Sequence, residues 1–134
     1  MGAWGYRNFE NDDAGDWVLE FEAKGIEAVR NALRAVAELS DEDYLEAPES
    51  CIALAAAEIV ASAKDGDISG LPEEARVAFA KHKDAIDAAR DPALAFAVVR
   101  RVLTSSELLD LWEEDTGLLD DWKAEVNGLI ARLA

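Results

Sequence analysis

The sequence predicts an all-α protein: a compact single domain over residues 1–134, with five to six helices around a central alanine-rich helix. Three observations support this prediction. Apolar residues recur at helical spacing throughout, and no β-type alternation interrupts them. Hydrophobic residues make up 51% of the chain, which is enough for a true core. The connectors between the helical segments are short, as in compact helical domains.

The first two helices are separated by a single glycine. The first helix runs to about Ala23 after one of three capping candidates, Asn11, Asp12 or Asp13. Its apolar residues share one face: Ala14, Trp17, Val18 and Phe21. Gly25 then breaks the chain, and a second amphipathic helix ends near Leu39. The apolar positions of this second helix are Ile26, Val29, Leu33 and Val36.

An acidic connector, residues 40–47, leads to the third helix. This helix covers residues 48–64 and has a proline in its first turn, where proline is well tolerated. Residues 51–61 are apolar nearly all round, and a helix of this kind is normally buried between others. We therefore expect it to be the central helix. A turn-rich loop then precedes a fourth helix over residues 72–90.

The last helices follow a second set of capping signals. Asp91-Pro92 is a cap followed by a proline at the first position of a fifth helix, which keeps one register to Trp112. The pattern Thr104-Ser105-Ser106-Glu107 resembles a capping box, so a break or kink is expected there. After a loop at 115–117, the final helix runs to the terminus.

The net charge of −16 argues against nucleic acid as a partner, because phosphate binding depends on Lys and Arg. The negative charge favours solubility, or it attracts a basic protein partner by electrostatic steering. Residues 1–23 carry six acids and one base, and residues 106–134 carry eight acids and two bases. Residues 72–105 carry six bases and five acids. The acidic ends could pack on this middle or mediate self-association, and a solvated acidic surface is the other interpretation.

The sequence predicts no membrane partner. No apolar run approaches the length of a bilayer span, and the N-terminus lacks the features of a signal peptide. Tyr6 stands where a myristoylation motif starting at Gly2 needs Ser or Thr. A single cysteine excludes an intramolecular disulfide. We expect a cytoplasmic protein.

The chain offers few groups for catalysis, and we predict no catalytic residue, no metal and no cofactor. His82 is the only histidine, which excludes sites built on several histidines, and we expect it beside Phe79 and Ile86 at the edge of an apolar face. We expect Cys51 to be buried and structural, because acids dominate its surroundings. The sequence has no glycine-rich phosphate loop, no G-x-S-x-G elbow and no Ser/His/Asp set.

Glu58 is the one ionisable residue deep in the alanine-rich helix. A buried carboxylate must be paired, hydrogen-bonded or protonated. Arg100 and Arg101 of the fifth helix are the partners we expect. A structural ion pair is the first interpretation and a catalytic acid the second, since perturbed acids often mark functional sites.

Two acidic clusters supply oxygen atoms of the kind that Mg²⁺ and Ca²⁺ prefer. The first cluster contains Asn11, Asp12, Asp13 and Asp16. The second contains Glu113, Glu114, Asp115, Asp120 and Asp121. Neither has the spacing of an EF-hand loop. Helix capping explains the first cluster and solvation explains the second, so a metal role is the weaker interpretation.

The opening segment is the most unusual part of the chain. Residues 1–17 contain two tryptophans and three glycines, Gly2, Gly5 and Gly15. Glycine is placed where the backbone takes positive φ or approaches something closely. We predict that residues 2–9 form a non-helical clasp, with Trp4 and Phe9 packed against the Trp112–Trp122 region.

Several stretches carry a family resemblance. The opening Met1-Gly2-x-Trp4-Gly5, then Phe9-x-Asn11-Asp12-x-Ala14-x-Asp16-Trp17, resembles the start of a bacterial family catalogued only as domain of unknown function 4259. Three later stretches agree in kind: Leu45-Glu46-Ala47-Pro48-Glu49, Ala55-Ala56-Ala57-Glu58 and Ser106-Glu107-Leu108-x-x-Leu111-Trp112-Glu113-Glu114. The helix with Trp122 also fits, whereas Tyr6-Arg7-Asn8 departs from the smaller, glycine-containing stretch expected there. The resemblance implies a small all-α bacterial domain and supplies no activity.

Two hypotheses for function result. The first is a non-enzymatic interaction module that binds a basic protein, as toxin-neutralising immunity proteins do, through acidic N- and C-terminal segments on one contiguous face. The alternative is a carboxylate-based metal or small-molecule site between the N-terminal motif and the Trp112–Trp122 region. A homodimer built on the apolar helices, without a ligand, is a third. The candidate binding residues are Trp4, Asp12, Asp13, Asp16, Trp17, Glu58, Trp112, Glu113 and Glu114.

Overall fold

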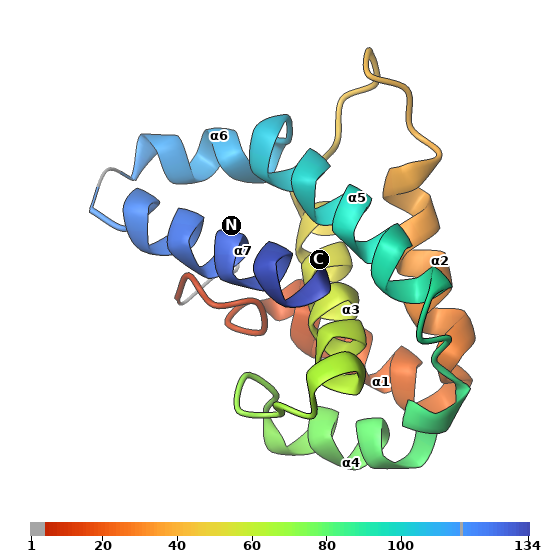
Figure 1. Ribbon diagram of the computed structural model, residues 1–134. Coiled ribbons are helices and arrows are strands. Elements are labelled where there is room, and N and C mark those ends of the chain that lie inside the picture. The colour runs from red at the N-terminus through yellow and green to blue at the C-terminus, as the bar shows by residue number, and fades with distance from the viewer. Residues whose placement is uncertain (1–4, 116) are drawn as a thin grey trace.

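The computed structural model is all-α, as the sequence predicts (Figure 1). It describes residues 5–115 and 117–134. In this part of the chain there is no strand, and the helices are α1 (Asp12–Lys24), α2 (Ile26–Ala37), α3 (Ala47–Asp65), α4 (Glu73–His82), α5 (Arg90–Thr104), α6 (Glu107–Glu114) and α7 (Leu119–Leu133), with a short 3-10 helix, η1 (Lys83–Ala85). These seven described α-helices exceed the expected five to six, because the predicted fifth helix is divided in two.

The division between α5 and α6 falls at the capping-box pattern. Ser105 ends α5 with a non-helical backbone, at a φ of −156° and a ψ of 84°. Ser106 caps α6, since its Oγ accepts a hydrogen bond from the backbone N–H of Leu109 at 3.1 Å. Glu107 does not complete the box. Its Oε1 accepts instead from the backbone N–H of Ala47 at 2.8 Å, which ties α6 to the start of α3.

Of the three residues expected to cap α1, Asn11 is the N-cap in the structure. Its Oδ1 accepts a hydrogen bond from the backbone N–H of Ala14 at 2.8 Å. Asp12 and Asp13 lie in the first turn, where their charge complements the positive end of the helix dipole. Gly25 separates α1 from α2 at a φ of +61°, a backbone conformation that favours glycine.

The central helix is α3. Thirteen of its residues are buried, and it packs against α1, α2, α5, α6 and α7 (Figure 1). Its fully buried alanines let the neighbouring backbones approach closely. Since the core surrounds this helix, a polar side chain on it must find its hydrogen-bond partner inside the protein.

The fourth helix is shorter than predicted. It ends at His82, and α5 begins at Arg90 rather than after a cap at Asp91. Asp87 provides the N-terminal hydrogen bond instead, because its Oδ1 accepts from the backbone N–H of Arg90 at 2.7 Å. Asp91 is buried, and its two oxygens accept from the Nε and Nη2 of Arg30 in α2, both at 3.1 Å. The predicted cap is therefore a link between helices.

The glycines of the opening segment have different surroundings. A Cβ at Gly5 would lie 2.4 Å from the Oε1 of Glu10, so this glycine permits a close approach. Gly15 lies inside α1, and a Cβ there would meet nothing within 4 Å, so our interpretation of this glycine was wrong. Gly2 lies outside the described residues.

Candidate functional site

The N-terminal segment meets the C-terminal helices at the Trp112–Trp122 pair. The two indole rings stack with their centroids 6.4 Å apart and 18° between their planes. Residues 5–8 and Asn11 lie around them and leave a space of about 10 Å³, which holds one water at most. The described residues around this space include no carboxylate. Within the described part of the chain, the alternative carboxylate site therefore has neither room nor acidic groups here.

The predicted clasp is only partly described. Residues 5–10 are non-helical, and Asn8 and Phe9 are both buried. Phe9 lines a separate hollow with Ser69, Gly70, Leu71 and Pro72. Trp4, both as a clasp residue and as a candidate binding residue, lies outside the described residues.

The other candidates on α1 do not converge on a site. Asp12 and Asp13 lie in the first turn of their own helix, and Asp16 is exposed. Trp17 is buried in the core, where its ring stacks on Phe21 at 5.3 Å with 1° between the planes. The described structure therefore assigns these acids to the helix end and the surface, and Trp17 to packing.

The acids of the α6–α7 turn are all exposed: Glu113, Glu114, Asp115, Asp120 and Asp121. None of the ion pairs found in the described residues involves them. The described part of the chain also contains no group of three or more His, Cys, Asp or Glu residues that could hold a metal ion. This turn is a concentration of unpaired negative charge.

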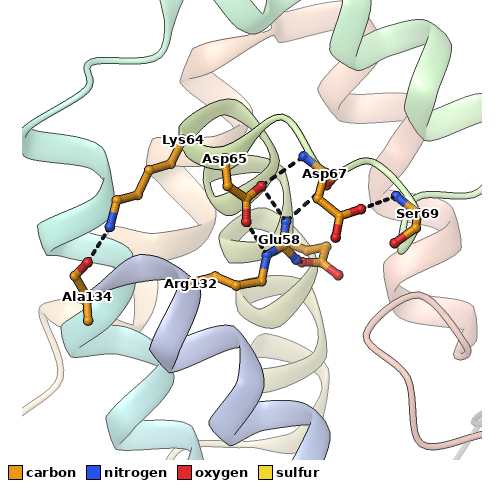
Figure 2. A network of polar contacts seen from close by, with 7 residues as sticks. All are labelled: Glu58, Lys64, Asp65, Asp67, Ser69, Arg132 and Ala134. Carbon is orange, nitrogen blue, oxygen red and sulfur yellow. Dashed lines mark hydrogen bonds and ion pairs between the residues drawn. The ribbon is translucent and has the colours of Figure 1, made fainter.

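Glu58 pairs with Arg132 of α7, and not with the arginines we predicted. The Nη1 of Arg132 donates to the Oε2 of Glu58 at 2.5 Å (Figure 2). Arg101 donates instead to backbone carbonyls of the 40–43 connector, and Arg100 lies over an aromatic ring of its own helix. The expected partners were wrong because α7 also crosses α3, and it brings its own arginine to Glu58.

Arg132 also holds the loop that follows α3. Its Nε donates to the Oδ2 of Asp65 at 2.7 Å, and its Nη2 donates to Asp65 and to the backbone carbonyl of Asp67, both at 3.0 Å (Figure 2). The hydrogen bond from Arg132 lowers the pKa of Asp65 below its usual value. All three guanidinium nitrogens are thus engaged in one network.

The electrostatics of Glu58 are set by burial. Burial raises the pKa of Glu58 above its usual value, and Arg132 opposes that effect. The negative charges of Glu125 and Asp65 raise the pKa further. A Cβ at Gly70 would lie 2.3 Å from the Oε1 of Glu58, so a larger residue at this position would have to displace the carboxylate.

A hollow of about 190 Å³ lies beside this ion pair. Its lining residues are Asn8, Glu58, Ala124, Glu125, Gly128, Leu129 and Arg132. Asn8 is only 4% exposed, and neither its Nδ2 nor its Oδ1 has a hydrogen-bond partner in the described structure. Of the predicted candidates, only Glu58 belongs to this hollow.

Sequence reasoning missed the roles of three polar residues that the structure buries or partly buries, which are Asn8, Asp91 and Arg132. Arg132 had a weak signal, since it is the only base in residues 124–134 of an otherwise apolar and acidic helix. Asp91 was recognised, although as a helix cap. Asn8 had no signal, because an asparagine in a turn before a helix is ordinary.

Cys51 should be unreactive in the folded protein. It is buried, and burial together with the charge of Asp13 raises its pKa to about 12. Thiolate is therefore scarce at neutral pH, and a thiol reagent reaches the sulfur only after unfolding. We expect labelling by a disulfide reagent to be at least about a hundred times slower in the native protein than in denaturant. Rapid labelling of the native protein would contradict the described burial.

The comparisons with known proteins identify the family. A family profile described as a domain of unknown function, DUF4259, matches residues 2–125. The chain belongs to this family. The DUF4259 resemblance seen in the sequence is therefore confirmed, although the family description supplies no activity. No curated protein and no solved structure matches the chain. The described helices of this DUF4259 protein include none that is long and apolar enough to cross a membrane.

Proposed function

We propose that this DUF4259 protein is a non-enzymatic, cytoplasmic interaction module that binds a basic protein partner through exposed carboxylates. The observation that carries the proposal is the unpaired acidic turn between α6 and α7. Its members are Glu113, Glu114, Asp115, Asp120 and Asp121. Unpaired surface charge of one sign speeds the encounter with a partner of the other sign.

The charge of this turn is not neutralised from within the described chain. The basic middle segment directs its arginines elsewhere, since Arg76 binds the backbone carbonyl of Leu71 and Arg101 binds carbonyls near residues 40–43. The ion pairs of Arg30 and Arg132 use buried or partly buried acids of other elements. The interpretation in which the acidic ends pack on the basic middle therefore finds no ion pair in the described residues.

The position of Glu113 and Glu114 is a further argument. Both lie in the last turn of α6, which contains no basic residue. The helix dipole makes a C-terminal turn unfavourable for acids and favourable for bases. Charges that cost the helix stability are expected where binding uses them.

The packing of α1 limits which acids can belong to the surface that binds the partner. α1 packs on α2, α3 and α4, whereas α6 packs on α3, α5 and α7. Most acids of α1 and the acids of the α6–α7 turn therefore belong to different parts of the surface. We assign the basic partner to the α6–α7 turn, where the facing ends of two helices combine their charges at one end of the molecule (Figure 1).

A charge-neutralising variant tests this assignment. The variant E113Q/E114Q/D120N/D121N should bind a synthetic Lys-rich peptide about tenfold more weakly than the wild type, because each exposed pair contributes a few tenths of a kcal/mol. Isothermal titration at low and at physiological salt measures the affinity. The peptide with Gln in place of Lys should not bind.

The matched control removes the same number of charges elsewhere. The variant E27Q/E38Q/D41N/E42Q changes four exposed acids of α2 and its connector, and it should keep the wild-type affinity. Equal losses in both variants would mean that only net charge matters. The acidic surface would then be a solvated one without a defined binding face.

Two structural expectations belong to the same proposal. The described part of the predicted clasp, residues 5–8, holds the C-terminal helices against α3, which is supported by its position around the Trp112–Trp122 pair. The apolar faces of the helices pack against one another within the monomer. The large apolar side chains that stay exposed in the described residues are scattered: Leu19, Tyr44, Ile68 and Val77. This distribution favours a monomer over the homodimer.

A further inference from the structure

A further hollow lies where the end of α3 meets α4. We call it the α3–α4 hollow, and it is bounded by Ala63 of α3, Ile68 of the following loop, α4 and η1. Its volume is about 500 Å³, which falls within the range of roughly 300–1,000 Å³ for small-molecule sites. The hollow beside Glu58, at about 190 Å³, falls below that range.

The charge of the α3–α4 hollow is opposite in sign to that of the whole protein. Its lining contains two bases, Arg76 and Lys83, and one acid, Asp84, whereas the chain has a net charge of −16. The Nε of Arg76 donates to the backbone carbonyl of Leu71 at 2.8 Å, and its other two guanidinium nitrogens make no hydrogen bond with the described residues. Neither base belongs to an ion pair in that part of the chain. The two cationic groups are therefore available to an anion.

Apolar surface that a ligand can reach accompanies these charges. Ile68 is 37% exposed, and Ala63 and Ala80 of the same lining are exposed as well. Phe79 is 7% exposed and adds a small accessible area. A ligand with an apolar body would remove this surface from water, which favours binding.

The loop that carries Ile68 is held in place before any ligand binds. The backbone N–H of Asp67 donates to the Oδ1 of Asp65 at 2.9 Å, and the backbone N–H of Ser69 donates to the Oδ1 of Asp67 at 2.9 Å (Figure 2). Arg132 ties the same loop to α7 through Asp65 and the carbonyl of Asp67. A wall that is already ordered lowers the entropic cost of binding.

From these observations we propose that the α3–α4 hollow binds a small organic carboxylate with an apolar body. The guanidinium of Arg76 donates hydrogen bonds to the carboxylate, Lys83 adds a second positive charge, and the apolar body covers Ile68. Two bases and one acid give the lining a formal charge of +1, which one carboxylate neutralises, and Asp84 would repel a second negative charge.

This site is independent of the protein partner proposed for the acidic α6–α7 turn. Glu107 ties α6 to the start of α3, whereas the hollow lies at the end of α3 that leads to α4. Figure 1 shows α4 and α6 near opposite ends of α3. Loss of binding at one site would therefore leave the other testable.

Four probes separate the charge from the apolar body. Phenylacetate carries both, phenylacetamide lacks the charge, phenethylamine reverses it, and acetate lacks the ring. At physiological ionic strength, phenylacetate should bind saturably and shift the methyl signals of Ile68 in ¹H–¹³C spectra. Phenylacetamide and acetate should each bind about tenfold more weakly. Phenethylamine should not shift these signals, although the negative charge of the whole protein attracts it.

Substitutions in the lining should change the affinity in both directions. Arg76→Gln should weaken the binding of phenylacetate about tenfold and leave that of phenylacetamide unchanged. Lys83→Gln should weaken it about threefold, and Asp84→Asn should strengthen it about threefold, because the acid opposes the charge of the ligand. The matched control Arg34→Gln removes a positive charge from an exposed position of α2 and should leave binding unchanged. Tighter binding in Asp84→Asn cannot result from a damaged hollow.

Three results would overturn the proposal. Equal affinities for phenylacetate and phenylacetamide would show that the hollow accepts an aromatic ring regardless of its charge. Equal losses in Arg76→Gln and Arg34→Gln would show that only the net charge of the protein matters. If phenylacetate causes no saturable shift of the Ile68 signals in the folded protein, the hollow holds solvent only.

Discussion

Replacing Arg132 with methionine is expected to lower the free energy of unfolding by about 3 kcal/mol at neutral pH. The change leaves the Glu58 carboxylate, whose side chain is 5% exposed, without its counter-charge. The same change also releases Asp65 and the carbonyl of Asp67 from α7. Urea-induced unfolding, followed by circular dichroism, measures the loss.

A matched pair of variants separates burial from charge. Lys24→Met removes a cation from the exposed pair with Glu20, whose side chains are 56% and 46% exposed, so the cost should stay within about 0.5 kcal/mol. The double variant Glu58→Leu/Arg132→Met should recover more than half of the loss, because it removes the buried charge together with its partner. If Lys24→Met and Arg132→Met cost the same amount, burial of the ion pair is not what stabilises this region.

The loss in Arg132→Met should depend on pH with a defined sign. Burial raises the pKa of Glu58 in the folded protein, and removing Arg132 raises it further. A carboxyl group whose pKa is raised by folding costs no stability when it is protonated in both states, and its cost grows as the pH rises from its unfolded pKa to its folded pKa. Arg132 lowers the pKa of Asp65, so the ionised Asp65 stabilises the folded wild type at a pH above its unfolded pKa. The variant loses this stabilisation in the same pH range. The variant should therefore approach the wild type in acid and fall below it as the pH rises.

Local patterns predicted the helices well because they depend on neighbouring residues. The apolar spacing of 51–61 identified the buried α3 helix, and the capping signals at residues 11–13 and 104–107 located the start of α1 and the break between α5 and α6. In each case the contact that matters lies within one turn of the chain. Helix periodicity and capping chemistry are sufficient at this range.

The same reasoning failed where a contact crosses the fold. Glu58 and Arg132 are separated by 74 positions, and their meeting depends on how α7 crosses α3. Asp91 lies in a sequence that is typical of a helix cap. Its carboxylate instead accepts hydrogen bonds from Arg30, 61 positions away, and Asp87 caps α5. Crossing angles of packed helices are set by side-chain packing over whole faces, which a pattern along one helix does not specify.

Replacing Gly25 with alanine is expected to lower the free energy of unfolding by about 3 kcal/mol, which combines backbone strain with a steric clash. Gly25 has a φ of +61° between α1 and α2. A Cβ there would lie 2.6 Å from the Nδ1 of His82. The ring cannot move easily, because it lies against Phe21 and its Nε2 is 2.9 Å from the carbonyl oxygen of Glu22. Thermal and urea-induced unfolding measure the effect.

Two other glycines make this prediction a controlled series. Gly66→Ala meets nothing within 4 Å but has a φ of +77°, so it should cost only the backbone strain, about 1 kcal/mol. Gly15→Ala has neither a positive φ nor a neighbour within 4 Å, and it should stabilise α1 by about 0.5–1 kcal/mol. The change from glycine to alanine is thus expected to lower the free energy of unfolding at two of these positions and to raise it at the third. If His82→Ala does not reduce the cost of Gly25→Ala to that of Gly66→Ala, the histidine ring is not the obstacle, and the strain belongs to the α1–α2 junction alone.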